Sequence, residues 1–161
     1  FCTGEITGGL FEDIGTAGGG DAVDVSTSQI SLNGTRFLNV DDKALSVGEA
    51  SQVQAENLII DACGTGAAAK DGSRLDIANS SIENSRISAL MAYIKKPEFG
   101  IAEVVARNMV MEGNRAVAVV QTGSRVSLDG EEFAPEDIDV DELYETVMRP
   151  GLRRPKPEAR E

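Results

Sequence analysis

Short stretches in which apolar and polar residues alternate recur along this chain about every 22 residues. Three such series run in parallel through the sequence, and each keeps the two-residue spacing of a β-strand. The first series is Val23/Val25, Leu45/Val47, Ala67/Ala69, Leu90/Ala92 and Val117/Val119. The second is Ile30/Leu32, Val53/Ala55, Leu75/Ile77, Val104/Ala106 and Val126/Leu128, and the third is Phe37, Ile60, Ile82, Met111 and Phe133. The pattern predicts three short strands in each period.

A coil of this length buries its apolar positions most simply by stacking each strand in parallel on its counterpart about 4.8 Å away. Residues 1–133 are therefore predicted to form an all-β, right-handed parallel β-helix of about six coils, the hand following the general preference of parallel crossovers. The corner after the second strand favours residues that tolerate a left-handed backbone. We expect stacked amides to hydrogen-bond along this buried column, which comprises Gly34, Asn57, Asn79, Asn108 and Gly130.

The repeat ends after Phe133, and a different pattern follows. Residues 134–148 form an acidic linker and one predicted helix, whose apolar face comprises Val140, Leu143, Tyr144, Val147 and Met148. We expect the helix to cap the open end of the solenoid, or alternatively to dock onto another protein. Residues 149–161 read as a basic, proline-rich tail. No cap precedes the first repeat, so we expect the amino end to be truncated and covered by further coils or another chain.

Composition excludes several classes of function. The formal net charge is −12, the aromatic content is 4%, and neither Trp nor His is present. Nucleic-acid binding needs basic patches with stacking rings, so it is not expected. Without histidine there is no Ser-His or Cys-His nucleophile and no imidazole metal ligand. No apolar run is long enough to span a membrane. Cys2 and Cys63 lack metal-type spacing and leave the redox compartment open.

Four segments carry a resemblance to a known family: residues 20–25, 42–48, 69–72 and 92–100. They are similar to β-helix segments of large bacterial secreted or surface proteins in the pectin-lyase-like superfamily. The resemblance implies an extracellular or cell-surface location and polysaccharide as a partner. Lyases of this fold hold calcium with carboxylates and use an Arg or Lys as a base. The candidate calcium ligands here are Asp21, Asp24, Asp41 and Asp42, and the candidate bases are Lys43 and Lys70. Because calcium prefers six to eight oxygens, we expect at most a weak site, or simply solvated aspartates.

One insertion lengthens a coil, at Lys95–Gly100, and insertions in solenoids often mark a binding face. Two lysines are flanked there by rings that could stack on a sugar, so the candidate ligand-binding residues are Tyr93, Lys95, Lys96 and Phe99. The alternative is a plain surface loop with Phe99 packed on the coil.

The sequence favours a non-catalytic structural or interaction module of a larger bacterial secreted or surface protein, with weak carbohydrate binding. The candidate carboxylates do not converge in the predicted columns, so no catalytic residues and no cofactor other than weakly bound calcium are assigned. Two alternatives stay open: a fragment of a polysaccharide lyase or related carbohydrate-active enzyme, and an end-to-end oligomerisation module.

Overall fold

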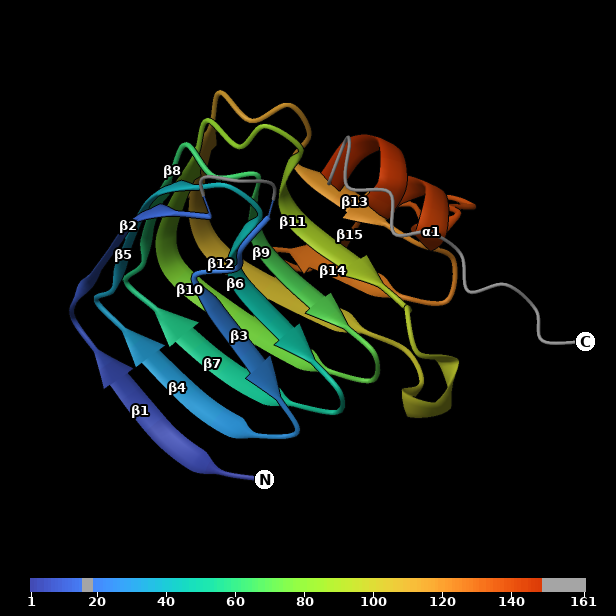
Figure 1. Cartoon of the computed structure of the whole chain (residues 1–161), viewed down its shortest axis with the longest axis horizontal. Coiled ribbons are helices and arrows are strands. Elements are labelled where there is room, and N and C mark those ends of the chain that lie inside the picture. The colour runs from blue at the N-terminus through green and yellow to red at the C-terminus, as the bar shows by residue number, and fades with distance from the viewer. Residues whose placement is uncertain (16–18, 149–161) are drawn as a thin grey trace, which may run out of the picture.

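The computed structural model describes residues 1–15 and 19–148 and shows a parallel β-solenoid of about five turns (Figure 1). This confirms the predicted parallel β-helix. The prediction of about six coils counted the first and last turns as whole. Among the described residues the first turn holds only β1 (Thr3–Thr7) and β2 (Leu10–Ile14), and the last parallel strands are β13 (Ala118–Val120) and β14 (Arg125–Leu128).

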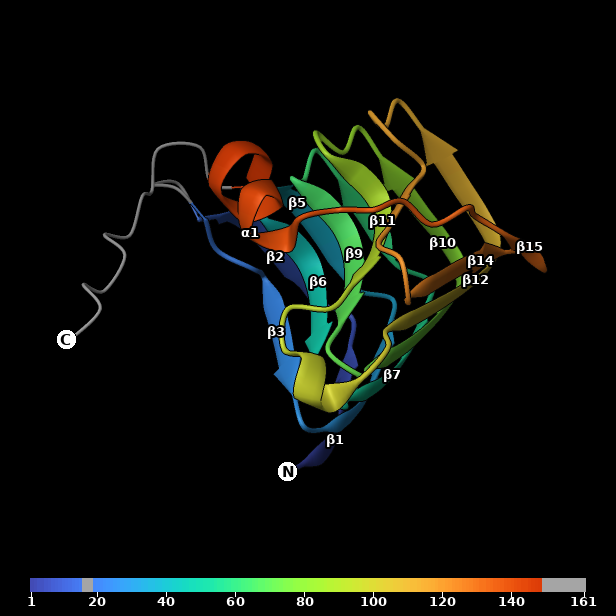
Figure 2. The same ribbon diagram turned by 90° about the vertical axis from the view of Figure 1, so that its right-hand side faces the viewer.

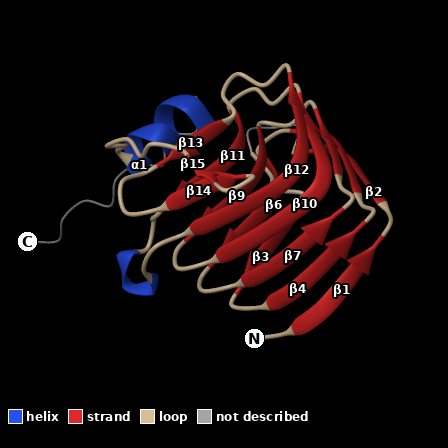
Figure 3. Cartoon of the chain, turned by 180° about the vertical axis from the view of Figure 1, so that it is seen from behind, coloured by secondary structure: helices blue, strands red, loops and turns tan. Residues whose placement is uncertain are grey.

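The strands form two sheets, which the turns of the solenoid connect (Figure 3). Sheet A contains β1, β2, β4 (Gln29–Asn33), β5 (Arg36–Val40), β7 (Gln52–Glu56), β8 (Ile59–Asp61), β10 (Arg74–Glu83), β12 (Glu103–Glu112), β14 and β15 (Glu131–Glu132). Sheet B contains β3 (Val23–Ser26), β6 (Lys43–Gly48), β9 (Thr65–Lys70), β11 (Ser88–Tyr93) and β13. The helical elements are η1 (Pro97–Phe99), α1 (Val140–Glu142) and the π-helical η2 (Leu143–Met148).

The strands pair in the register that the repeats predict, with two exceptions, at Val117 and at Phe133. Val23, Leu45, Ala67 and Leu90 are successive partners along sheet B. In the last turn, however, Leu90 pairs with Ala118 and not with Val117. The predicted inward pair Val117/Val119 is therefore wrong by one residue, because Ala118 and Val120 face the core while Val119 packs outside the sheet.

The core consists of columns of stacked, mainly aliphatic side chains that run along the solenoid. Phe37, Ile60 and Ile82 are partners on adjacent strands, and each is fully buried. Phe11 extends this column, with its ring centroid 5.2 Å from that of Phe37. Burying a side chain of this size stabilises the fold by about 1.5–3 kcal/mol. A narrow interior filled by single side chains explains the small aromatic content.

The corner residues Gly34, Asn57, Asn79, Asn108 and Gly130 all adopt positive φ angles, as the left-handed corner requires. Asn108 donates through Nδ2 to Oδ1 of Asn79 at 2.8 Å. Asn57 donates to Oδ1 of Asn33, at 2.9 Å, because the position above it is a glycine without a side chain. We expected these amides to be buried, but they are exposed. Their hydrogen bonds therefore connect neighbouring turns at the surface of the corner.

A second polar column lies inside another corner and was not recognised in the sequence. The backbone N–H of Ser28 donates to Oγ of Ser51, and the N–H of Ser51 donates to Oγ of Ser73, each at 3.1 Å. Ser51 Oγ in turn donates to the carbonyl of Gly48 at 2.6 Å. The buried hydroxyls of Ser51 and Ser73 therefore each accept a backbone N–H of the preceding turn. The serines recur with the period of the strands, which is the signal that could have revealed them.

The carboxyl end of the solenoid is closed by extended chain. β15 pairs antiparallel with β14, which turns the predicted inward strand at Phe133 into the end of a hairpin. The backbone of Glu136 then forms an isolated parallel β-bridge with Gln121, directly after β13. Helix α1–η2 packs elsewhere, against the outer face of sheet B (Figure 2). The expectation that the helix covers the open end is thus corrected, because its apolar face finds Ala68 and Met91 on that outer face. No helix among the described residues is long and apolar enough to cross a membrane.

Two adjacent isoleucines test the core. Ile60 is fully buried, whereas the side chain of Ile59 is 44% exposed. Ile60→Ala should lower the free energy of unfolding by about 2–5 kcal/mol, because it leaves a cavity in a column that cannot collapse. Ile59→Ala is the matched control and should change it by less than about 0.5 kcal/mol. Urea denaturation measures both, and equal losses would contradict the assigned register.

The corner conformation gives a second prediction. Asn57 has a φ of 55°. Asn57→Ala should destabilise the fold by about 1–2 kcal/mol, since a Cβ with no compensating amide is unfavourable in the left-handed region. Asn57→Gly should retain most of the stability, because glycine adopts this conformation readily. If thermal unfolding ranks alanine above glycine, the backbone argument fails.

Candidate functional site

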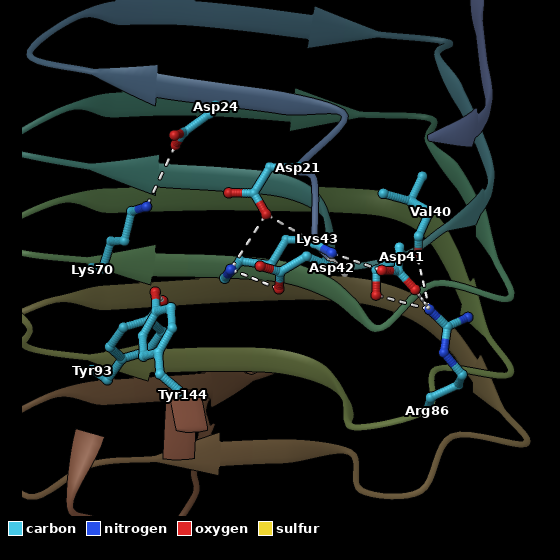
Figure 4. A network of polar contacts seen from close by, with 11 residues as sticks. Asp21, Asp24, Val40, Asp41, Asp42, Lys43, Lys70, Arg86, Tyr93 and Tyr144 are labelled. Carbon is cyan, nitrogen blue, oxygen red and sulfur yellow. Dashed lines mark hydrogen bonds and ion pairs between the residues drawn. The ribbon is translucent and has the colours of Figure 1, made fainter. Parts of the chain in front are cut away.

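A group of ionisable and aromatic side chains lies on the outer face of sheet B, and we call it the Lys43 cluster (Figure 4). Its members are Asp21, Asp42, Lys43, Tyr93 and Tyr144. Lys43 begins β6 directly after a corner, and Asp21 lies at the matching corner one turn earlier. Tyr93 ends β11, and the helix brings Tyr144 over the sheet.

Lys43 is held between two carboxylates. Its Nζ lies 2.8 Å from Asp42 Oδ1 and 3.3 Å from Asp21 Oδ1. Asp21 Oδ1 also accepts the backbone N–H of Lys43 at 3.2 Å, which fixes the carboxylate on the strand. Lys43 is 1% exposed and Asp42 is fully buried. A buried ammonium is tolerated only with such partners, so this pairing holds the first two turns of sheet B together.

Two tyrosines lie beside this ion pair. The hydroxyls of Tyr93 and Tyr144 are 2.6 Å apart, and their rings meet edge to face with centroids separated by 6.0 Å. Lys43 Nζ lies 5.6 Å from the centroid of the Tyr144 ring. Lys95 Nζ is 4.3 Å from the same centroid, a cation–π contact that ties the inserted loop to the helix.

The surroundings shift the pKa of two of these groups, Lys43 and Tyr93. Burial lowers the pKa of Lys43, but the attraction of Tyr144, Asp21 and Asp42 outweighs burial and leaves that pKa above its usual value. Burial, and then the proximity of Tyr144, raises the pKa of Tyr93 well above its usual value. Lys43 therefore stays an ammonium and Tyr93 a neutral phenol, which suits hydrogen bonding better than proton abstraction.

The four aspartates proposed as calcium ligands do not converge. Asp21 and Asp42 bind Lys43, whereas Asp24 pairs with Lys70 Nζ at 3.5 Å. Asp41 accepts the N–H of Gly19 at 2.8 Å and lies 3.6 Å from the guanidinium of Arg86. Within residues 1–15 and 19–148 no three acidic or cysteine side chains are grouped so that they could hold a metal ion. The aspartates do not form one group because three different cations pair with them: Lys43 with Asp21 and Asp42, Lys70 with Asp24, and Arg86 with Asp41.

The inserted loop also differs from its expected arrangement. Tyr93 is fully buried beneath the helix, so its ring cannot stack on a sugar from solvent. Phe99 is 39% exposed and lies at the turn around Gly72. A Cβ at Gly72 would clash with the Phe99 carbonyl oxygen, so this close approach requires glycine.

The two lysines of the loop have separate roles. Lys96 forms an ion pair with Glu49, at 2.5 Å. The backbone N–H groups of Lys95 and Lys96 both donate to Asp71 Oδ1, each at 2.6 Å. Only Lys95 and Tyr93 among the predicted ligand-binding residues therefore adjoin the Lys43 cluster, through Tyr144.

Of the two residues that organise the site, the sequence named Lys43 as a candidate beside the corner aspartates but missed Tyr144. Lys43 occupies a strand position whose partners in later turns are Thr65 and Ser88, so a lysine there also stands out from the repeat. Tyr144 was assigned only to the apolar face of a helix, and nothing in the spacing indicates that this face meets sheet B.

Comparisons with known protein families, with curated proteins and with solved structures find no match to this chain.

The buried ion pair predicts a large effect of removing its cation. Lys43→Met should lower the free energy of unfolding by about 3–5 kcal/mol, because two carboxylates lose the buried charge that compensates them. Lys96→Met removes an ion pair at the surface and should have little effect, so it is the control. Chemical denaturation at neutral pH compares the two, and similar small losses would mean that Lys43 is not buried.

The same pair makes stability depend on pH in the alkaline range. The folded-state pKa of Lys43 is raised, so its contribution is fully present below the ordinary lysine pKa of about 10.4 and is lost as pH rises through the folded-state pKa. Wild-type protein should therefore lose more stability than Lys43→Met above that pH. Unfolding curves of both proteins across this range would check the difference, and parallel losses would contradict the assignment.

Proposed function

We propose that this chain is a non-catalytic structural and interaction module of a larger bacterial secreted or surface protein, with weak carbohydrate binding on the outer face of sheet B. The module acts outside the cell or at its surface. Its rigidity comes from continuous parallel pairing and from side-chain ladders that connect each turn to the next.

The observation that carries this proposal is the internal pairing of the charged groups in the Lys43 cluster. Lys43 is buried and already neutralised by Asp21 and Asp42. A general base needs a lone pair at working pH, and a raised pKa removes it from this amine. The arrangement therefore supports a structural role for the ion pair.

Weak carbohydrate binding is supported by the rim of the cluster. The half-buried ring of Tyr144 and the exposed Lys95 lie together, and the Lys70–Asp24 pair lies on the same outer face of sheet B. Aromatic rings with adjoining hydrogen-bonding groups match the alternating apolar and hydroxylated faces of sugars.

The second candidate is a fragment of a polysaccharide lyase or related enzyme. It is favoured by one observation, the placing of an amine within 3.3 Å of two carboxylates on the outside of a parallel sheet. In that case Lys43 would be needed for activity and for stability alike.

Incubation with polygalacturonate, with and without calcium, separates the two candidates. We expect no ultraviolet-absorbing unsaturated product, together with slight retardation of the folded protein in gels that contain soluble polysaccharide. Product that appears with wild-type protein and disappears with Lys43→Met would favour the enzyme. Migration unaffected by any neutral or acidic polysaccharide would remove carbohydrate binding from the proposal.

A further inference from the structure

Three buried hydroxyls on sheet B have no hydrogen-bond partner in the structure. They are Ser46 Oγ, Thr65 Oγ1 and Ser88 Oγ, and all three residues are fully buried. Thr65 is the strand partner of both Lys43 and Ser88, so these three residues form one row across β6, β9 and β11. Strand partners project to the same face of a sheet, so Thr65 lies on the strand next to Lys43 and Ser88 lies one strand further along the same face.

Ser85 Oγ and Ser124 Oγ also lack a partner, but other buried hydroxyls of the solenoid are paired. In the serine corner Ser51 donates to a carbonyl and accepts an N–H of the neighbouring turn. Ser80 likewise donates to the carbonyl of Ala78 and accepts the N–H of Leu58. A buried hydroxyl without a partner is unfavourable, because it loses its hydrogen bonds to water and gains none. The row therefore has hydrogen-bonding capacity that the chain itself does not use.

The cover over this face is a separate packing unit. Val140 and Met148 of the helix are buried against Ala68, Met91 and Tyr93 in a cluster distinct from the interior core. The helix follows an extended segment that is anchored through Glu136 (Figure 2). The helix thus packs on the outer face of sheet B next to the row, and its Tyr144 lies beside Lys43.

We propose that the row Lys43–Thr65–Ser88 is a binding site for one neutral sugar residue of a glycan, and that helix α1–η2 is its cover. This inference rests on the proposed carbohydrate binding and names its location. Sugar hydroxyls both donate and accept, as the Thr65 and Ser88 hydroxyls require. The Lys43 ammonium supplies a further donor, the Asp21 carboxylate supplies an acceptor, and the ring of Tyr93 at the end of β11 supplies an apolar wall.

Charge selects against acidic sugars. Lys43 carries one positive charge between the two carboxylates of Asp21 and Asp42, so the ion-paired group is negative overall. A uronate carboxylate entering this row would meet like charge in a site shielded from solvent. A neutral hexose meets no such repulsion, and this difference separates the site from one built for acidic polysaccharides.

Two-dimensional amide NMR of the full chain tests the site with D-glucose, D-galactose and D-galacturonate as separate probes. A neutral sugar should shift the amide signals of Thr65 and Ser88 at millimolar concentration and slow hydrogen exchange in residues 140–148, whereas galacturonate should do neither. Lack of any shift with both neutral sugars would overturn the proposal, and so would an equal response to galacturonate.

The Thr65→Val variant tests both the stability of the row and its binding of sugar. Replacing an unpaired buried hydroxyl with a methyl group should raise the thermal midpoint by about 2–4 °C and abolish the sugar-induced shifts. Ser31→Ala, on the outer face of sheet A, is the control and should leave the shifts intact. A lowered midpoint, as expected for a hydroxyl already bonded to trapped water, or shifts that persist in Thr65→Val, would contradict the site.

Failure here is distinguishable from failure of the proposed function. If polysaccharide gels retard the protein but the Thr65 and Ser88 amides do not respond, this location is wrong and weak carbohydrate binding stands. If neither experiment shows binding, both proposals fall.

Discussion

Parallel backbone pairing between equivalent residues of successive turns is the constraint on which the whole structure depends. Each strand must lie about 4.8 Å from its counterpart, so every position meets the same kind of position one turn away. Apolar residues then form continuous columns such as Phe11, Phe37 and Ile60. A substitution in one turn therefore changes the packing of the residues stacked on it in the adjacent turns. A narrow interior of this kind admits aliphatic side chains more readily than large rings.

The same stacking decides how polar groups are satisfied. Asparagines at an outer corner and serines at an inner corner bond to their equivalents, as Asn108 does with Asn79 and Ser28 with Ser51. A polar residue that differs from the other residues of its column cannot pair with them and needs partners elsewhere. Lys43 lies in a column with Thr65 and Ser88, and it is stabilised from outside that column, by Asp21 and Asp42.

The helix covers part of the outer face of sheet B, where the character of the side chains changes from turn to turn. Sheet B changes from polar to apolar along its outer face, from Asp24 and Ser46 to Ala68 and Met91. The helix covers the apolar part, and its Tyr144 reaches the polar part next to Lys43. Structural packing and the candidate site therefore share the same residues, which is why stability and binding are expected to change together in variants of this face.

The sequence by itself determined the solenoid, because period, alternation and corner residues such as Asn57 report local backbone geometry and strand stacking. It also identified most of the register, failing at Val117, where a longer turn shifts the pairing by one residue. Only the tertiary structure decided what the loop and the helix contact. The burial of Tyr93, the division of the aspartates among different cations and the meeting of Tyr144 with Lys43 depend on contacts between distant segments, which no local pattern encodes.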